Sequence, residues 1–186
     1  MGGFRKRFFG PFAKFRSRSS GLHGVKAVTR IAMVCLGNIC RSPMAEAVAS
    51  AMVEEAGLAG RVRIESFGTL PDHVGEGTHG MAAAALARRG WPVSDHRARQ
   101  ITPDDIARVN LILCAEHANR TSVMSMAGTG LSPGKVHMLR TYDPQGGPEA
   151  EVPEPGGGDD ARFDQVLDIV ERSCRGLVSE LAAVID

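Results

Sequence analysis

Aromatic residues are scarce in this chain of 186 residues, because phenylalanine, tryptophan and tyrosine together make up only 5% of it. There is one tryptophan and one tyrosine, and five of the seven phenylalanines lie within residues 1–27. The rest of the chain therefore has few rings with which to clamp an aromatic ligand, a contact that contributes roughly 0.5–1.5 kcal/mol per ring pair.

Metal-binding and membrane-spanning patterns are also missing. The histidines have no metal-ligand spacing, and the four cysteines form no zinc pattern, so we expect neither a metal nor another cofactor. No apolar run is long enough for a signal core or a membrane span. Scattered cysteines without a secretory segment favour a reducing compartment, so we expect a cytoplasmic location.

Acidic residues are absent before Glu46, whereas residues 1–27 carry seven basic ones: Arg5, Lys6, Arg7, Lys14, Arg16, Arg18 and Lys26. Residues 31–186 hold 14 basic and 21 acidic residues, a net charge of −7, so a basic segment precedes an acidic body. We expect residues 1–27 to be a disordered tail and residues 28–186 to be one domain. Residues 4–18 also suit contact with an anionic membrane surface, and no specific binding of nucleic acid is expected.

The stretch from Val34 to Pro43 (VCLGNICRSP) carries the chemistry. It places a cysteine, five residues, an arginine and a hydroxyl between an apolar strand, 28–34, and a helix expected over 43–56. Pro43 suits a first helical turn, and Gly57 suits the position just past a helix end. Such a loop points backbone N–H groups and the positive end of a helix into one bowl, which binds a tetrahedral dianion.

Each residue of this loop has an expected task. The local field at Cys35 favours thiolate over thiol, so its sulfur should be nucleophilic near neutral pH. Arg41 offers a planar fork for two phosphate oxygens. Gly37 is expected to adopt an unusual φ and to let the backbone approach the ligand closely, whereas Asn38 tolerates the left-handed backbone conformation. The Ser42 hydroxyl can donate to the Cys35 sulfur.

The segment Cys35–Ala47 (CLGNICRSPMAEA) resembles the signature of the low-molecular-weight protein tyrosine phosphatases. Later segments resemble further parts of that family in the same order, and together they cover about residues 28–186: Ile64–Thr69, Asp95–Ile101, Leu139–Gln145, Val152–Pro155 and Phe163 to the end. The resemblance implies hydrolysis of phosphotyrosyl proteins or small aryl phosphates through a phosphocysteine intermediate.

The resemblance also implies roles for further residues. The expected phosphate-binding loop consists of Leu36, Gly37, Asn38, Ile39, Cys40, Arg41 and Ser42. Asn38, Ser42, Ser66 and His96 are expected to brace it. Cys40 is either a redox partner that bonds to Cys35 in the curled loop or a small buried residue.

The general acid departs from the family pattern. The family has an aspartate before a proline, and here the matching residue is Glu154, which adds one methylene. Asp143, before Pro144, is a rival, although its surroundings match a structural segment of the family, and a third interpretation is that no effective acid remains. The family's aromatic walls are also missing, and Tyr142 replaces them only if its loop folds over the site.

Secondary-structure patterns support an α/β fold independently of the resemblance. Apolar runs at 28–34, 62–67, 110–114 and 136–139 alternate with helical patterns at 43–56, 79–89, 103–107, 116–126 and 160–184. This alternation predicts a single-domain, four-stranded parallel sheet with helices on both faces, preceded by the basic tail.

The leading hypothesis is a protein tyrosine phosphatase in which Cys35, Arg41 and Glu154 are catalytic. The alternative is a phosphate-ester binding module that keeps the loop but has weakened catalysis. Arsenate reduction is disfavoured because it needs shuttling cysteines close together, and Cys114 and Cys174 lie far apart. Phosphoarginine hydrolysis is disfavoured because related phosphatases with that preference usually carry threonine where Ile39 stands.

Overall fold

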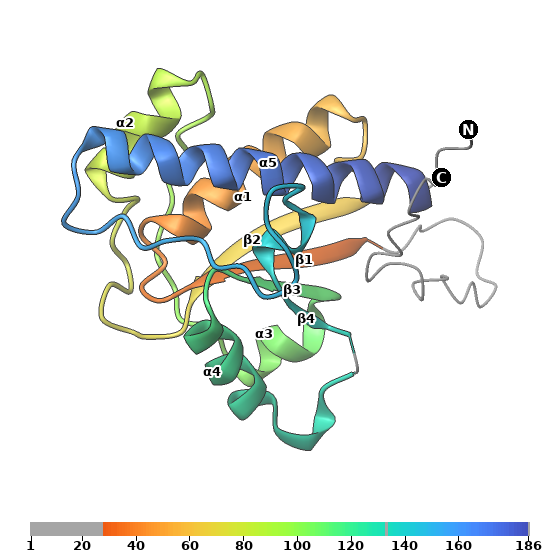
Figure 1. The fold of residues 1–186 in the computed structure, drawn as a ribbon. Coiled ribbons are helices and arrows are strands. Elements are labelled where there is room, and N and C mark those ends of the chain that lie inside the picture. Colours follow the sequence, from red (N-terminus) through yellow and green to blue (C-terminus); the bar gives the residue numbers. More distant parts are fainter. Residues whose placement is uncertain (1–27, 133, 186) are drawn as a thin grey trace, which may run out of the picture.

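The computed structural model describes residues 28–132 and 134–185, which form a sheet with helices on either side (Figure 1). The strands are all parallel and lie in the order β2-β1-β3-β4. Their bounds are β1 (Thr29–Cys35), β2 (Val62–Gly68), β3 (Leu111–Cys114) and β4 (Val136–Met138). The predicted four-stranded parallel sheet is confirmed. The expected tail, residues 1–27, lies outside the described residues.

Helices connect the strands and cover both faces of the sheet, because parallel pairing requires crossover connections. On one face lie α1 (Arg41–Glu55), α2 (Gly80–Arg88) and α5 (Asp160–Val184), and α5 packs along both of the others (Figure 1). On the other face lie α3 (Pro103–Arg108) and α4 (His117–Ala127). Short 3-10 helices are η2 (Gly128–Gly130) and η3 (Leu139–Tyr142). None of the helices in the described part of the chain has the length and apolarity that a membrane crossing requires.

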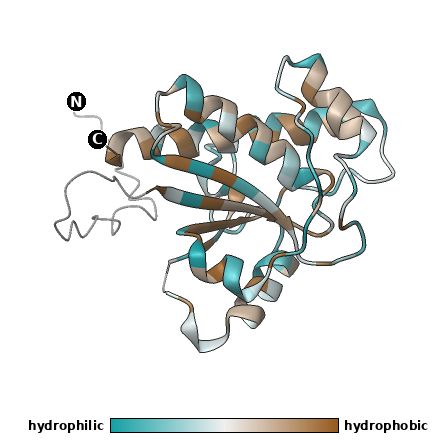
Figure 2. Cartoon of the chain, turned by 180° about the vertical axis from the view of Figure 1, so that it is seen from behind, coloured by the Kyte–Doolittle hydropathy of each residue, from teal (hydrophilic) through white to brown (hydrophobic). Residues whose placement is uncertain are grey.

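The core lies on both faces of the central strand. Successive side chains of a strand point to opposite faces. Accordingly Ile31 and Met33 pack in the cluster beneath α1 and α5, whereas Ala32 and Val34 pack with Phe67 on the other face. Figure 2 shows hydrophobic residues in every strand, interrupted by hydrophilic ones in β2 and at the start of β1. Burial on both faces explains why the first strand is one continuous apolar run rather than an alternating one.

The predicted helices and strands are confirmed with small shifts at their ends. Helix α1 begins at Arg41, two residues earlier than expected, and Pro43 is then the third residue, where a helix still needs no N–H. Gly57 follows this helix with a φ of +69°, as expected past a helix end. The fourth strand ends at Met138 because the chain continues into η3.

The segment after η3 is clamped to α5. Tyr142 is buried in the core, and a Cβ on Gly176 of α5 would overlap the Tyr142 carbonyl oxygen, so only glycine allows this approach. Tyr142 therefore packs against α5 and does not form a wall over the loop that follows β1. Asp143 has no exposed side-chain surface and pairs with Arg140 and Arg172, each at 3.1 Å.

The loops at the carboxyl ends of the strands are tied to one another. Leu70 N donates to Leu36 O at 3.0 Å, and Ala115 N donates to Val34 O at 2.8 Å. Val152 N donates to Ala115 O at 2.7 Å, which brings the segment before α5 to the same edge. Because β1 lies between β2 and β3, its carboxyl end is the strand-order switch at which such sheets bind ligands.

Candidate active site

The loop 36–40 joins β1 to α1 and turns back toward Cys35. Asn38 N lies 3.3 Å from Cys35 Sγ, and Ser42 Oγ lies 3.0 Å from the same sulfur. Cys40, the residue before α1, provides no side-chain cap, so the first N–H groups of the helix are free for a ligand. These donors and the helix dipole favour negative charge on the sulfur and on any anion in the loop.

Asn38 holds the loop in its shape. It has a φ of 57°, the left-handed conformation that was expected, and its side chain is fully buried. The Nδ2 atom donates to Ser42 Oγ and to Ser66 Oγ, both at 2.9 Å. The Oδ1 atom accepts from Arg99 N at 2.9 Å. Its side-chain bonds therefore fix the loop to the first turn of α1, to β2 and to the segment before α3.

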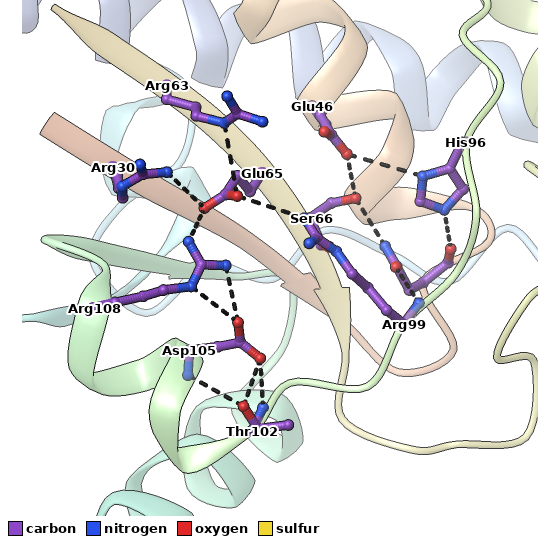
Figure 3. Close-up of polar contacts among 11 residues, drawn as sticks. Arg30, Glu46, Arg63, Glu65, Ser66, His96, Arg99, Thr102, Asp105 and Arg108 are labelled. Atoms are coloured by element: carbon purple, nitrogen blue, oxygen red, sulfur yellow. Dashed lines mark hydrogen bonds and ion pairs between the residues drawn. The ribbon is translucent and has the colours of Figure 1, made fainter. Parts of the chain in front are cut away.

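A second row of polar contacts supports the loop from behind. His96 Nε2 lies 2.7 Å from Asn38 O, and Ser66 Oγ donates to Glu46 Oε2 (Figure 3). His96 Nδ1 also lies 3.9 Å from Glu46 Oε2. The structure thus places next to the loop Ser66 and His96, the two residues that the family resemblance implied as its supports, and adds Glu46 of α1 as the residue that contacts both.

The expected unusual φ of Gly37 is wrong, because Gly37 does not have a positive φ. The close approach of its backbone to a ligand stays a prediction. A Cβ at this position would lie 2.6 Å from His73 Cδ2, so any larger residue would displace that partly exposed ring. At the end of β2, a Cβ on Gly68 would lie 2.7 Å from the Leu36 carbonyl oxygen, which is backbone and has little freedom to move. Both glycines therefore serve close packing around the loop.

Arg41 is 2% exposed and is held by acceptors from two other loops. Glu116 accepts from its two terminal nitrogens at 3.0 and 3.3 Å, and Val152 O accepts from one of them at 3.3 Å. Burial alone would lower the pKa of Arg41, but the hydrogen bond to Glu116 and the charges of Glu154 and Cys35 raise it above its usual value. Arg41 therefore stays positive in the site.

Glu154 reaches the same guanidinium from the segment before α5. One of its carboxylate oxygens pairs with Arg41, and the other accepts from Gly156 N at 3.0 Å. Its side chain is 49% exposed, so it lies at the mouth of the site. The rival carboxylate, Asp143, is paired with Arg140 and Arg172 instead and makes no contact with Arg41, in agreement with a structural role.

All four cysteines are buried free thiols. Among them, Cys40 lies in the loop. Burial first, and then the charges of Glu154 and Cys35, raise the pKa of Cys40 to about 12. Cys40 therefore stays protonated at neutral pH. Its expected role as a redox partner of Cys35 stays a prediction.

Two functional contacts were missed from the sequence alone. Glu116 follows β3 in a segment (Cys114-Ala115-Glu116) that shows only a strand end, although a carboxylate at the carboxyl end of a central parallel strand was a usable signal. Glu46 lies on α1, one turn after the loop. Its contact with Ser66 follows from the way α1 packs beside β2, which the sequence does not show. Within the described residues, no group of three or more His, Cys, Asp or Glu side chains could hold a metal ion.

Comparison with known proteins places this chain among well-described relatives. Residues 30–185 match the family model described as low molecular weight phosphotyrosine protein phosphatase. A low molecular weight protein-tyrosine-phosphatase of Streptomyces coelicolor is 40% identical over 151 residues, which is 81% of this chain and 92% of that protein. The low molecular weight phosphotyrosine protein phosphatase of Homo sapiens is 32% identical over 156 residues, 83% of this chain and 97% of that protein.

Solved structures show the same fold. A protein tyrosine phosphatase from Entamoeba histolytica, crystallised with Hepes in its active site, superposes with a TM-score of 0.77. It is 27% identical, and the match covers 82% of this chain and 96% of that one.

Proposed function

Because this chain belongs to the low molecular weight phosphotyrosine protein phosphatase family, and is therefore a cysteine-dependent protein tyrosine phosphatase, we propose that Cys35, Arg41 and Glu154 carry out its reaction. The observation that carries the assignment is the convergence of Ser42 Oγ and Asn38 N on the Cys35 sulfur beside a buried arginine. These groups stabilise a thiolate nucleophile and the charge of a bound phosphate.

In the first half-reaction, the Cys35 thiolate attacks phosphorus in line with the bond to the tyrosine oxygen. The S–P bond forms as the P–O bond breaks, and Glu154 gives its proton to the departing phenol oxygen. Arg41 and the backbone N–H groups of the loop stabilise the equatorial oxygens. Arg41 Nε is buried and has no hydrogen-bond partner in the described residues, so its N–H is available to donate to a phosphate oxygen.

In the second half-reaction, a water molecule attacks phosphorus and displaces the sulfur. Glu154 takes the proton of that water, and the Ser42 hydroxyl, 3.0 Å from Cys35 Sγ, stabilises the departing thiolate. Glu154 has to leave Arg41 for both steps. Its half-exposed position and its single backbone contact, to Gly156 N, leave it free to do so.

The proposed role of Glu154 is tested by kcat/KM on a phosphotyrosyl peptide, with Cys35→Ser as the blank. We expect Glu154→Gln to lower kcat/KM by about a hundredfold or more, within the 10²–10⁴ range of general acid catalysis. Glu154→Asp is the matched control, because it keeps the carboxylate. The loss should be much smaller on p-nitrophenyl phosphate, since nitrophenolate leaves without a proton.

The alternative function, a binding module with weak turnover, is favoured by the longer acid and by the glycines at 156 and 157 in place of aromatic walls. It takes the lead if the native protein and Glu154→Gln both turn over the peptide barely faster than Cys35→Ser. A cytoplasmic location is part of the proposal and is supported by the four cysteines, all of which are free thiols.

A further inference from the structure

Four arginines gather on the sheet face that carries α3. Arg30 of β1, Arg63 of β2, Arg99 and Arg108 of α3 surround the buried carboxylate of Glu65 (Figure 3). We call these four side chains the arginine face. None of them takes part in the proposed reaction through its guanidinium.

This part of the sheet is covered by guanidinium groups rather than by a helix. Helix α4 packs on β3 and β4, and α3 packs on α4. On this face, β1 and β2 are therefore covered by side chains rather than by a helix. The Arg99 guanidinium lies 4.2 Å from the centre of the Phe67 ring, and that of Arg108 lies 5.8 Å from it. Cation–π contacts thus seal the core here, with positive charge outside.

The charges of the arginine face are only partly neutralised. Arg108 donates to Glu65 at 2.6 Å and also pairs with Asp105. Arg30, Arg63 and Arg99 lie 3.7–3.9 Å from Glu65, beyond hydrogen-bond distance, and the Arg63 side chain is 64% exposed. Four guanidinium groups therefore share two carboxylates, and most of the N–H groups of three forks remain available to an outside anion.

The arginine face lies where the basic segment of the chain joins the body. Arg30 is the second residue of β1, and the 27 residues before Val28 carry seven basic residues, five phenylalanines and no acid. Residues 28–186 hold the remaining 15 basic residues against 21 acidic ones, a net charge of −6. This end is thus a basic region on an otherwise acidic body.

We propose that the arginine face and residues 4–18 together dock this protein on a membrane surface rich in anionic phospholipid. Planar guanidinium forks such as those of Arg30 and Arg63 suit bidentate binding of headgroup phosphates. Phenylalanines interspersed with basic residues suit the boundary between headgroups and acyl chains. Those phenylalanines favour a lipid surface over a nucleic acid or an acidic protein, because their rings can enter the apolar boundary while the basic residues stay at the anionic headgroups.

The test is cosedimentation of the full chain with vesicles of two compositions. We expect binding to an equimolar mixture of phosphatidylcholine and phosphatidylglycerol, and none to phosphatidylcholine alone. The double variant Arg30→Gln/Arg63→Gln should bind the mixed vesicles at least about tenfold more weakly, because each basic group near such a surface contributes about fivefold. Arg162→Gln removes one positive charge from an exposed residue near the start of α5, as Arg63→Gln does from β2, and should bind as the native protein does.

Folding is checked separately from binding. The double variant leaves the Arg108–Glu65 bond intact, so its turnover of p-nitrophenyl phosphate should match the native rate. If it does not fold, Arg63→Gln alone should still weaken binding about fivefold, since Arg63 is the most exposed member. The proposal would be overturned if these variants bound mixed vesicles as the native protein does, or if the native protein bound phosphatidylcholine alone equally well. It would also be overturned by tighter binding to duplex DNA or polyglutamate than to mixed vesicles.

Discussion

At the scale of single residues, Glu116 fixes the direction of the Arg41 fork. Both terminal nitrogens of Arg41 donate to this one carboxylate, at 3.0 and 3.3 Å. Glu116→Gln keeps the shape but has one acceptor oxygen instead of two and no charge. We expect kcat/KM on a phosphotyrosyl peptide to fall about tenfold or more, because hydrogen bonds to charged groups contribute about 1.5–3 kcal/mol.

The matched control for this prediction is Glu116→Asp, which keeps the charge. A shared loss of thermal stability in both variants would point to a purely structural role for Glu116. Activity of Glu116→Gln at the native level would contradict the assignment, since Arg41 would then be held adequately without a carboxylate.

The sequence alone predicted those site residues that lie together in one short motif. Cys35, Arg41 and Ser42 lie in one continuous motif, so their proximity follows from chain connectivity. Ser66 and His96 were reached only through the family resemblance. Glu116 was missed because its contact with Arg41 spans 75 residues of sequence, and no local pattern records such a distance.

At the scale of elements, Asp143 ties the segment after η3 to α5. Burial by itself would raise the pKa of Asp143, but hydrogen bonds from Arg172, from Gln145 N and from Arg140 hold it below its usual value. Its contribution to stability is therefore present above the unfolded-state pKa of about 3.9 and is lost as the pH falls through the lower folded-state pKa.

We expect Asp143→Asn to lower the free energy of unfolding by about 2–3 kcal/mol at neutral pH. This is somewhat less than for a fully buried pair, because Arg172 is 30% exposed. The difference from the native protein should begin to shrink below about pH 4, where the unfolded chain takes up a proton at this carboxyl. It should vanish once the pH has fallen through the lower folded-state pKa. Urea unfolding at several pH values measures both effects.

The control for this prediction lies on α5, the helix that carries Arg172. Asp168→Asn removes a half-exposed carboxylate that pairs with Arg89, and surface pairs of this kind contribute at most about 1 kcal/mol. An equal loss for both variants would show that burial does not distinguish the two pairs. A loss at Asp143 that does not shrink as the pH falls below about 4 would contradict the lowered pKa of its carboxyl.

Helices and strands could be told apart in the sequence because each has its own hydrophobic period. Their ends could be predicted only where a residue such as glycine or proline favours a helix end or start. Gly57 marks the end of α1 well. Pro43 marks its start poorly, since proline is tolerated at more than one position of a first turn. The tight contact between Gly176 and Tyr142 has no local signature, so the sequence left the position of the tyrosine open.

At the scale of the whole molecule, the alternation of strands and helices was enough to predict a parallel sheet covered on both faces. The order β2-β1-β3-β4 and the register of the strands were not predicted, because they depend on which helix packs on which face. The charge asymmetry was visible in the sequence as two blocks. Only the fold shows that Arg30, Arg63, Arg99 and Arg108 come together at the point where the basic block joins the body.

The ion pair between Glu154 and Arg41 has a consequence for inhibition. An oxyanion that binds Arg41 has to displace the carboxylate of Glu154. Because Glu154 belongs to the same chain, its effective concentration at Arg41 is in roughly the millimolar range or above. Inorganic phosphate and sulfate should therefore inhibit this enzyme weakly, whereas a phosphotyrosyl peptide displaces the internal competitor with its additional contacts. Glu154→Gln should lower the inhibition constant of phosphate severalfold, and an unchanged constant would contradict this. One carboxylate would then both deliver the proton and protect the enzyme from the product that it releases.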